Sequence, residues 1–426
     1  MPVLLLCISI TELFCAAGLR AQNVSDTLRL HLPDAEKIFM EKNLSLLATK
    51  YNVDINKALT EQAKLWDNPV LVTDQNIYAD HAFFAHGKDA NGQPTGQYFI
   101  QVQQLIKTAG KRSKWVAMAE TNTKLSELQF NEIMRNLKYQ LRSDYYTIAK
   151  LLSVHQLYET ELSQLQFLLS GMEAQLKAGN IAQKDYLRIR ALIYSMQQDA
   201  ADNDRQLADA ETDLKTLLQL NGNVFIDPSI NVAITANTDE LKLAELLTTA
   251  KQHNSGYQIQ QLQLLYQQQN LSYQKALKSP DLTIGPEYDH NSNYAPHYVG
   301  LSISLPLNIF NKNQGNIKAA QISVKQQETY VNEAELELSN AVQNAMTKLL
   351  LTKQLSSKQE QDFYVSYETL FRNITDSYRQ RQISLIEFID SFDAYRDTRL
   401  QWLQQQLNLQ LAKEELNYQA GKDVVN

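Results

Sequence analysis

The sequence of 426 residues is poor in cysteine, and the two that it has, Cys7 and Cys15, lie near the N-terminus. Residues 1–21 have the apolar centre and the terminal alanine of a secretory signal peptide, although no lysine or arginine precedes the apolar centre. We expect this segment to be removed on export; the alternative is a buried N-terminal segment. The mature chain would then have no cysteine, which excludes disulfides and thiolate metal sites.

The sequence also lacks an excess of positive charge and a long apolar run. The formal net charge of −7 gives no reason to expect a nucleic-acid partner. No segment after the N-terminus reaches the roughly 18 apolar residues of a membrane-spanning helix. We find no nucleophile motif, no paired-histidine motif and no glycine-rich dinucleotide turn. The sequence therefore predicts no enzyme activity, no cofactor and no resident metal.

Proline, which breaks helix interiors, is absent from residues 95–227 and again from residue 307 to the end. Within both gaps apolar residues recur at spacings of three and four, as on one face of a helix. The pattern predicts long helices over about 111–178 and 316–378, each followed by a partner helix, over about 184–220 and 385–419. A helix as long as the first would extend roughly 100 Å. Helices of this length must pack side by side as extended hairpins.

Between the helical segments the period changes to two, which indicates strands with one apolar face. Small or polar residues such as Ser302 occupy the opposite face. One apolar face beside lipid and one polar face beside water would suit a strand of a membrane barrel. A weaker pair of strands is predicted over about 69–78 and 98–105. The residues that we expect to face lipid are Leu282, Ile284, Val299, Leu301 and Ile303.

The two halves of the chain repeat the same order of elements. Asn43 aligns with Asn254 and Leu71 with Leu282, both at a spacing of 211 residues. We expect a first repeat at residues 22–222, a linker at 223–240 and a second repeat at 241–426. Four strands cannot close a barrel, and an open sheet edge is not tolerated within lipid. Three copies would supply twelve strands, so the sequence predicts a homotrimer.

In this duplicated order of elements, the chain resembles the TolC family of outer-membrane efflux ducts. The opening "LHLPDAEKIFMEKN" is similar to the signature of the family's first helix and is echoed by "LKLAELLTTAKQHN". The segment "QVQQLIKTAGKRSKW" resembles the Gly-Lys-Arg junction of the cobalt-zinc-cadmium branch. The resemblance also rests on two similar turns, in "KAGNIAQKDYL" and "RQRQISLIEFI", which lie at the ends of the long helices.

The resemblance implies a mainly α-helical fold with a small β-barrel portion. A trimer would form a 12-stranded barrel in the outer membrane and a periplasmic α-helical tunnel, with residues 223–240 in an equatorial region. Such a duct is passive. It is opened by a periplasmic adaptor protein and powered by an inner-membrane pump of the RND or ABC type. A different class remains open: a periplasmic coiled-coil scaffold that never enters lipid.

The resemblance also implies roles for residues beside the two turns. Glu387 and Asp390 would form a cation-selective constriction at the closed end of the tunnel, and repulsion between copies would raise their pKa values. Asp185 and Tyr378 would hold neighbouring tips together. The alternative for the acids is an ordinary solvated helix face.

The turns themselves would be the adaptor-docking tips. The first turn would offer a flexible glycine and one exposed apolar residue, and its alternative is an ordinary helix C-terminus. Arg381 stands where the family usually has glycine, so the second turn is expected to bend differently. The residues of these docking tips are Gly179, Asn180, Ile181, Arg381 and Ile383.

Overall fold

The computed structural model describes residues 26–79, 81–83, 87–88, 90–92, 94–222, 224–229, 241–292, 295–356 and 358–425. The predicted signal peptide lies outside this part of the chain. The elements of the first repeat are β1 (Asp26–Leu30), α1 (Leu32–Lys42), α2 (Leu44–Ala63), β2 (Val70–Gln75), β3 (Tyr78–Ala79), β4 (Ala82–Phe83), β5 (Gly87–Lys88), β6 (Pro94–Thr95), β7 (Tyr98–Ile106), α3 (Lys111–Lys177) and α4 (Gln183–Leu218). Those that follow are β8 (Val224–Pro228), α5 (Leu243–His253), α6 (Ser255–Ala276), β9 (Leu282–Asn291), β10 (Pro296–Ser304), α7 (Gln314–Leu355), α8 (Lys358–Arg379) and α9 (Leu385–Ala420).

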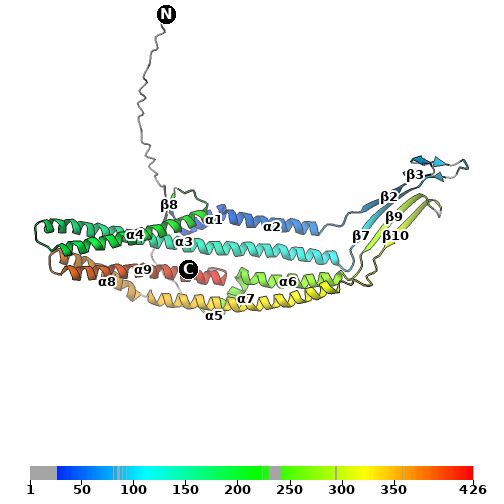
Figure 1. The fold of residues 1–426 in the computed structure, drawn as a ribbon. Coiled ribbons are helices and arrows are strands. Elements are labelled where there is room, and N and C mark those ends of the chain that lie inside the picture. The colour runs from blue at the N-terminus through cyan, green and yellow to red at the C-terminus, as the bar shows by residue number, and fades with distance from the viewer. Residues whose placement is uncertain are drawn as a thin grey trace, which may run out of the picture.

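The molecule is long and thin, with a sheet at one end and two helical hairpin tips at the other (Figure 1). Helix α3 runs the whole way between them; its 67 residues give a length of about 100 Å at about 1.5 Å per residue. The first predicted long helix and both predicted partner helices are thus confirmed. Among the described residues, no helix has both the length and the apolar character needed to cross a membrane.

The second long helical segment differs from the prediction, because it is two helices. Helix α7 ends at Leu355, and Ser356 leaves the helical conformation with φ −104° and ψ 29°. The segment from the residue before the helix to the tip turn is one residue shorter here, Asn313 to Arg381 against Gly110 to Gly179. One missing residue turns the following side chains by about 100°, so an unbroken helix would carry its apolar face away from the core.

The duplication extends to individual hydrogen bonds. Asn43 and Asn254 each precede a helix, and each side chain accepts a hydrogen bond from the backbone N–H three residues on. Their amide groups also donate to the ends of the partner helices, from Asn43 to the carbonyl of Leu217 and from Asn254 to that of Gln419. Each asparagine therefore joins two elements of its own repeat by hydrogen bonds. Both asparagines are buried.

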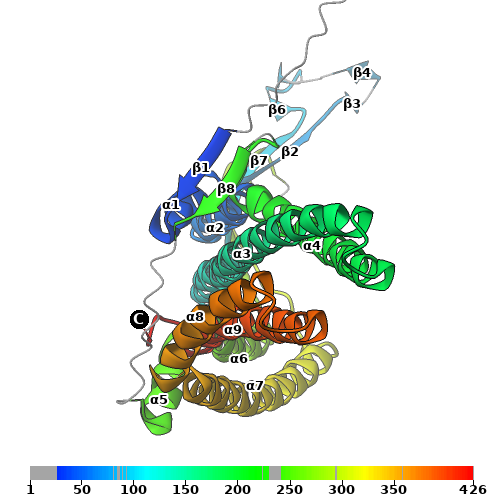
Figure 2. The ribbon, with the colours of Figure 1, turned by 90° about the vertical axis from the view of Figure 1, so that its left-hand side faces the viewer.

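The long elements lie side by side in a fixed order. Helix α3 contacts α2 and α4 on one side and α6 and α9 on the other, and α7 and α8 then pack on α6 and α9. Figure 2 shows these layers from the end that carries the tips. The chain therefore has two outer edges, one formed by α2 and α4 and the other by α7 and α8.

The four-stranded sheet also has two outer edges, one in each repeat. Its strand order is β10-β9-β7-β2, so β2 and β10 are the edge strands, and all neighbouring strands are antiparallel. In the β9–β10 hairpin Ile303 lies opposite Ile284 and Leu301 opposite Pro286, so the predicted apolar residues share one face. Val299, Leu301 and Ile303 are 74%, 62% and 64% exposed. The other face is polar, and there Gln101 donates a hydrogen bond to Glu287. The predicted alternation is confirmed in the β9–β10 hairpin, whereas in the β2–β7 hairpin it is broken by Gln104 and Thr73 on the apolar face.

Midway along the molecule, β1 and β8 form a parallel two-stranded sheet against α3. Tyr145 of α3 is buried and donates its hydroxyl hydrogen to the carbonyl of Leu30, while Ile226 of β8 fills the core beside it. Residues 224–229 of the predicted equatorial linker thus contact the waist of the first repeat. The rest of the linker, residues 223 and 230–240, lies outside the described residues.

Candidate functional site

The two tip turns share one backbone geometry. Gly179 has φ +75° and Arg381 has φ +58°, both left-handed. Matching hydrogen bonds close the turns: the N–H groups of Gly179 and Asn180 donate to the carbonyls of Leu176 and Gln175, and those of Arg381 and Gln382 donate to the carbonyls of Tyr378 and Ser377. The expectation that Arg381 changes the bend is therefore wrong. The arginine instead adopts the conformation of the glycine, which costs a residue with a Cβ about 1–2 kcal/mol.

The apolar residues of the turns differ from the prediction. Ile181 was expected to be exposed for docking, yet Ile181 and Ile383 are both half-buried against the same apolar core of the tips. The residues that point away from the core are polar or small: Gly179, Asn180 and Arg381 are exposed. Each isoleucine packs back because it follows the left-handed residue by two positions and contacts its own hairpin, as in many helix C-termini.

Tyr378 of α8 lies within range of the charge of Asp185, which belongs to α4 of the other hairpin. The Tyr378 ring stacks on Phe388 with centroids 4.7 Å apart. Burial, and then the charge of Asp185, raise the pKa of the Tyr378 hydroxyl. Asp185 also lies in the first turn of α4, where a helix favours negative charge. The predicted role of this acid and this tyrosine in holding neighbouring tips together stays a prediction.

Glu387 and Asp390 are both exposed on the first turns of α9. The Glu387 carboxylate accepts a hydrogen bond from the Ser384 N–H at 2.7 Å, and the Ser384 hydroxyl accepts one from the Glu387 N–H. This reciprocal pair caps the helix. The bond from the Ser384 N–H lowers the pKa of Glu387 in the single chain, opposite in direction to the rise expected from repulsion between copies. Glu387 therefore caps α9, a role that was not predicted from the sequence.

A buried acid farther along α3 was also not predicted. Glu161 is 2% exposed, and neither carboxylate oxygen has a hydrogen-bond partner. The nearby charges come from α9, where Arg396 pairs with Asp393 and Asp397 at 3.2 and 3.1 Å. Burial raises the pKa of Glu161 to about 8; Arg396 opposes this rise, and Asp393 and Asp397 add to it. Its sequence signal is its position on the apolar face, three residues after Tyr158 and four before Leu165.

We expect this acid to make the tip hairpins less stable as the pH rises. Below the unfolded pKa near 4.5 Glu161 is neutral in both states; up to about pH 8 only the folded chain keeps the proton. Stability is therefore lost as the pH rises from about 5 through 8. Thermal unfolding of detergent-solubilised protein should show that Glu161→Gln flattens this dependence. Glu173→Gln, at an exposed position on the same helix, should leave it unchanged; equal profiles for wild type and Glu161→Gln would contradict the assignment.

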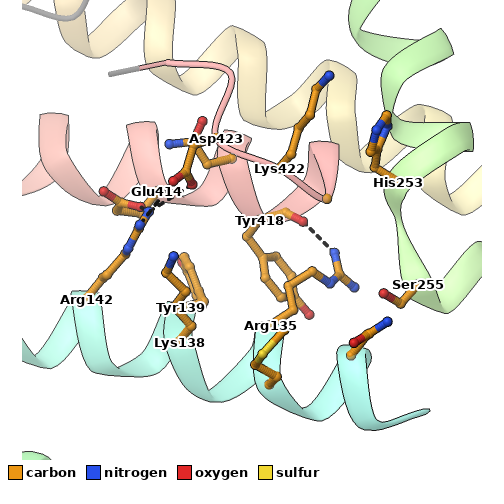
Figure 3. Close-up of a pocket in the computed structure, with 14 residues that line it drawn as sticks. Arg135, Lys138, Tyr139, Arg142, His253, Ser255, Glu414, Tyr418, Lys422 and Asp423 are labelled. Carbon is orange, nitrogen blue, oxygen red and sulfur yellow. Dashed lines mark hydrogen bonds and ion pairs between the residues drawn. The ribbon is translucent and has the colours of Figure 1, made fainter. Parts of the chain in front are cut away.

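At the waist, Arg142 joins the two repeats and the C-terminal segment (Figure 3). Its guanidinium lies 2.6 Å from Glu36 of α1, 2.6 Å from Glu414 of α9 and 3.0 Å from Asp423. Burial would lower the pKa of Arg142, but the bonds to Asp423, Glu414 and Glu36 outweigh it and raise the pKa. Glu414 is itself buried, so Arg142 neutralises a charge that water cannot reach.

Beside this cluster lies an open pocket of about 440 Å³ between α3, α9 and the α5–α6 junction. Arg135 closes one side, pairing with Glu132 at 2.6 Å and lying over the Tyr418 ring at 4.3 Å. The charged groups that surround the pocket are thus largely paired with one another. In the part of the chain that the structure describes, no three His, Cys, Asp or Glu side chains come together as a metal site would require.

Comparisons with known proteins agree with this fold. Residues 38–219 match the family described as outer membrane efflux protein. A search of solved structures finds CusC, with a TM-score of 0.72 and 17% identity over 93% of both chains. The outer-membrane channel OprN matches with a TM-score of 0.74 and 13% identity over 92% of this chain and 89% of that one. VceC of Vibrio cholerae matches at 0.69 and 13% identity, over 92% and 96%.

One curated relative extends the match along the sequence. The cobalt-zinc-cadmium resistance protein CzcC of Cupriavidus metallidurans is 21% identical over 385 residues, which covers 88% of this chain and 86% of that protein. The resemblance to TolC-like channels is thereby confirmed at the level of the fold: residues 38–219 match the outer membrane efflux protein family, and 93% of the chain aligns with the fold of CusC. The matched family and OprN are described as outer-membrane proteins.

Proposed function

We propose that this chain is the outer-membrane exit duct of a tripartite efflux system. Three copies would close their sheets around a pore in the lipid and their helices around a tunnel about 100 Å long. The duct catalyses no reaction. Cargo enters at the helical tips and leaves through the ring of strands.

The observation that carries this proposal is the coincidence of an exposed apolar sheet face with two unpaired edges. The face formed by Val299, Leu301 and Ile303 is open to the surroundings, as lipid contact requires. Among the described strands, β2 and β10 each have a neighbouring strand on one side only, and the outer edge of each must be covered if the sheet enters lipid. Both needs are met when copies join edge to edge. A periplasmic scaffold, the alternative, would have no use for an apolar sheet face.

The partners follow from the two ends of the molecule. A periplasmic adaptor would dock on the exposed tips, at Gly179, Asn180 and Arg381, and an inner-membrane RND-type or ABC pump would supply the energy. The name of CzcC suggests divalent cations such as cobalt, zinc and cadmium as cargo. A tunnel with acids at its narrow end suits that charge, because a ring of like charges concentrates counterions.

The proposal is tested by envelope fractionation followed by sedimentation of the detergent-extracted protein. We expect the protein in the outer-membrane fraction, and a particle with the mass of three chains. A stable monomer in that membrane, or recovery in the soluble periplasmic fraction, would contradict the proposal and favour the scaffold.

The tip acids give a second prediction. Glu387→Gln combined with Asp390→Asn should remove most of the cation selectivity of the trimer in a planar bilayer, together with block by multivalent cations. The helix start should survive, because the amide oxygen of glutamine can also accept the hydrogen bond from Ser384. Asp209→Asn, an exposed acid on α4 far from the tips, is the matched control. Unchanged selectivity in the double variant would reduce the acids to capping and solvation.

A further inference from the structure

A second pocket lies farther along α3 toward the tips, where α3, β8 and α9 meet. Its volume is about 270 Å³, close to the lower limit of the roughly 300–1,000 Å³ of small-molecule sites. Three leucines, Leu152, Leu403 and Leu407, give the pocket apolar surface, and the polar groups that line it are mainly amides and hydroxyls. An apolar surface with a few polar groups is typical of a ligand site.

The charge of Lys150 in this pocket is not compensated. Lys150 is half-buried, and no carboxylate of the described residues pairs with its ammonium group. Burial alone lowers the pKa of this group, so no acid lies close enough to counteract the effect. Asp227 also lines the pocket, but its carboxylate pairs with Arg29 at 3.4 Å. An anion in the pocket would offset the cost of burying the ammonium group.

Two neutral side chains of the pocket can also bind a ligand. Gln410 is only 8% exposed, and its Oε1 atom is buried without a hydrogen-bond partner among the described residues. Burial, and then the charge of Glu414, raise the pKa of the Tyr146 hydroxyl to about 12. This hydroxyl therefore stays protonated and can donate, while the Gln410 amide can accept. A buried polar atom without a partner costs free energy, so Gln410 favours a ligand with a donor.

The spacing of the lining residues limits the size of the ligand. Leu403 and Gln410 are seven residues apart on α9, which is about 10 Å at about 1.5 Å per residue. Lys150 lies about one turn from Tyr146 on α3. An acid group on one ring or on a short chain fits this length.

We propose that this pocket binds a small organic anion, with its acid group at Lys150, its apolar body against the three leucines and a hydrogen-bond donor at Gln410. Helix α3 belongs to the first repeat and α9 to the second, so a bound anion would join the two repeats near the waist. Because the site lies within one chain, binding depends neither on transport nor on the assembly proposed above.

Calorimetric titration of the detergent-solubilised protein with benzoate tests the site, after subtraction of the heat measured with detergent alone. Benzamide is the uncharged probe of the same shape. We expect saturable binding of benzoate, about tenfold tighter than that of benzamide, because a hydrogen bond to a charged partner is the stronger one. 4-Hydroxybenzoate adds a donor and should bind several times tighter than benzoate, and Gln410→Leu should remove that gain.

Lys150→Met should reduce the preference for benzoate over benzamide to within about twofold, while Lys150→Arg, which keeps the charge, should retain the preference. Lys124→Met is the matched control, since this exposed lysine lies about 40 Å away on the same helix. Equal benzoate affinity in wild type and Lys150→Met would place the binding elsewhere and overturn the site. If Lys150→Met does not fold, the wild type decides: no saturable benzoate binding, or equal affinity for benzoate and benzamide, overturns the proposal.

Discussion

Replacing Ile303 with arginine should prevent stable insertion of this protein into the outer membrane. Ile303 is 64% exposed and lies opposite Ile284 on the apolar face of the sheet. An arginine near the middle of the bilayer on a lipid-facing strand costs about 2–4 kcal/mol, and three copies would each add that cost. Heat-modifiable trimer in outer-membrane fractions should fall to a small fraction of the wild-type amount.

Ser302→Arg is the matched control, because the adjacent residue points to the other face of the same strand. There Ser302 lies opposite Gly285 and close to the polar side chains of Gln101 and Glu287. We expect this variant to assemble at close to the wild-type level. Equal loss of trimer from both variants would mean that the sheet has no lipid face.

The second large effect is expected at the waist, where Arg142→Met should destabilise the helical part by about 3–5 kcal/mol. The substitution retains much of the side-chain length but leaves the buried Glu414 carboxylate without its partner at 2.6 Å. Chemical unfolding in detergent measures the loss. Arg142→Met combined with Glu414→Leu should recover part of it, because the unpaired charge is then gone.

Arg205→Met is the control for this prediction. Arg205 pairs with Asp202 on the surface of α4, and both side chains are more than half exposed. Such a pair contributes within about 0.5 kcal/mol. A loss at Arg142 no larger than that at Arg205 would show that the cluster of Glu36, Glu414 and Asp423 does not depend on the guanidinium.

Most of the architecture could be predicted from the sequence, because its signals are local and repeated. The gaps without proline delimited α3, α4 and α9 to within two residues at most boundaries. The alternation from Val299 to Ile303 identified both the strand and its apolar face. Asn43 and Asn254 aligned in sequence and proved to be equivalent helix caps. In each case one residue or one period determines the local structure.

Other features could not be predicted, since they depend on partners distant in sequence or on small differences between the repeats. The break at Ser356 follows from one residue fewer than in the first repeat, which becomes visible only when both ends of the segment are placed. Arg381 adopts a left-handed conformation that composition assigns to glycine, because the helices on both sides of it fix the turn. Glu161 and Arg142 acquire their roles from α9 and the C-terminal segment.

The residues assigned to the tips were predicted only in part: their place in the molecule was predicted, but their local contacts were not. The sequence brought Asp185, Tyr378, Glu387 and Asp390 to the same end of the molecule, and the structure agrees on that place. It adds local roles to two of them, since Tyr378 packs on Phe388 and Glu387 caps α9. Selectivity measurements therefore use the amide variants, which keep the helix cap.

The most direct test of the account is the conductance of the purified trimer in a planar lipid bilayer. We expect discrete current steps that favour cations, and small steps for the wild type if the tips close the tunnel. The steps should be larger for Asp185→Ala, which removes a charge beside Tyr378 where the two hairpins meet. A trimer that inserts into the bilayer but gives no current steps, in the wild type and in Asp185→Ala alike, would contradict the claim that this chain forms an exit duct.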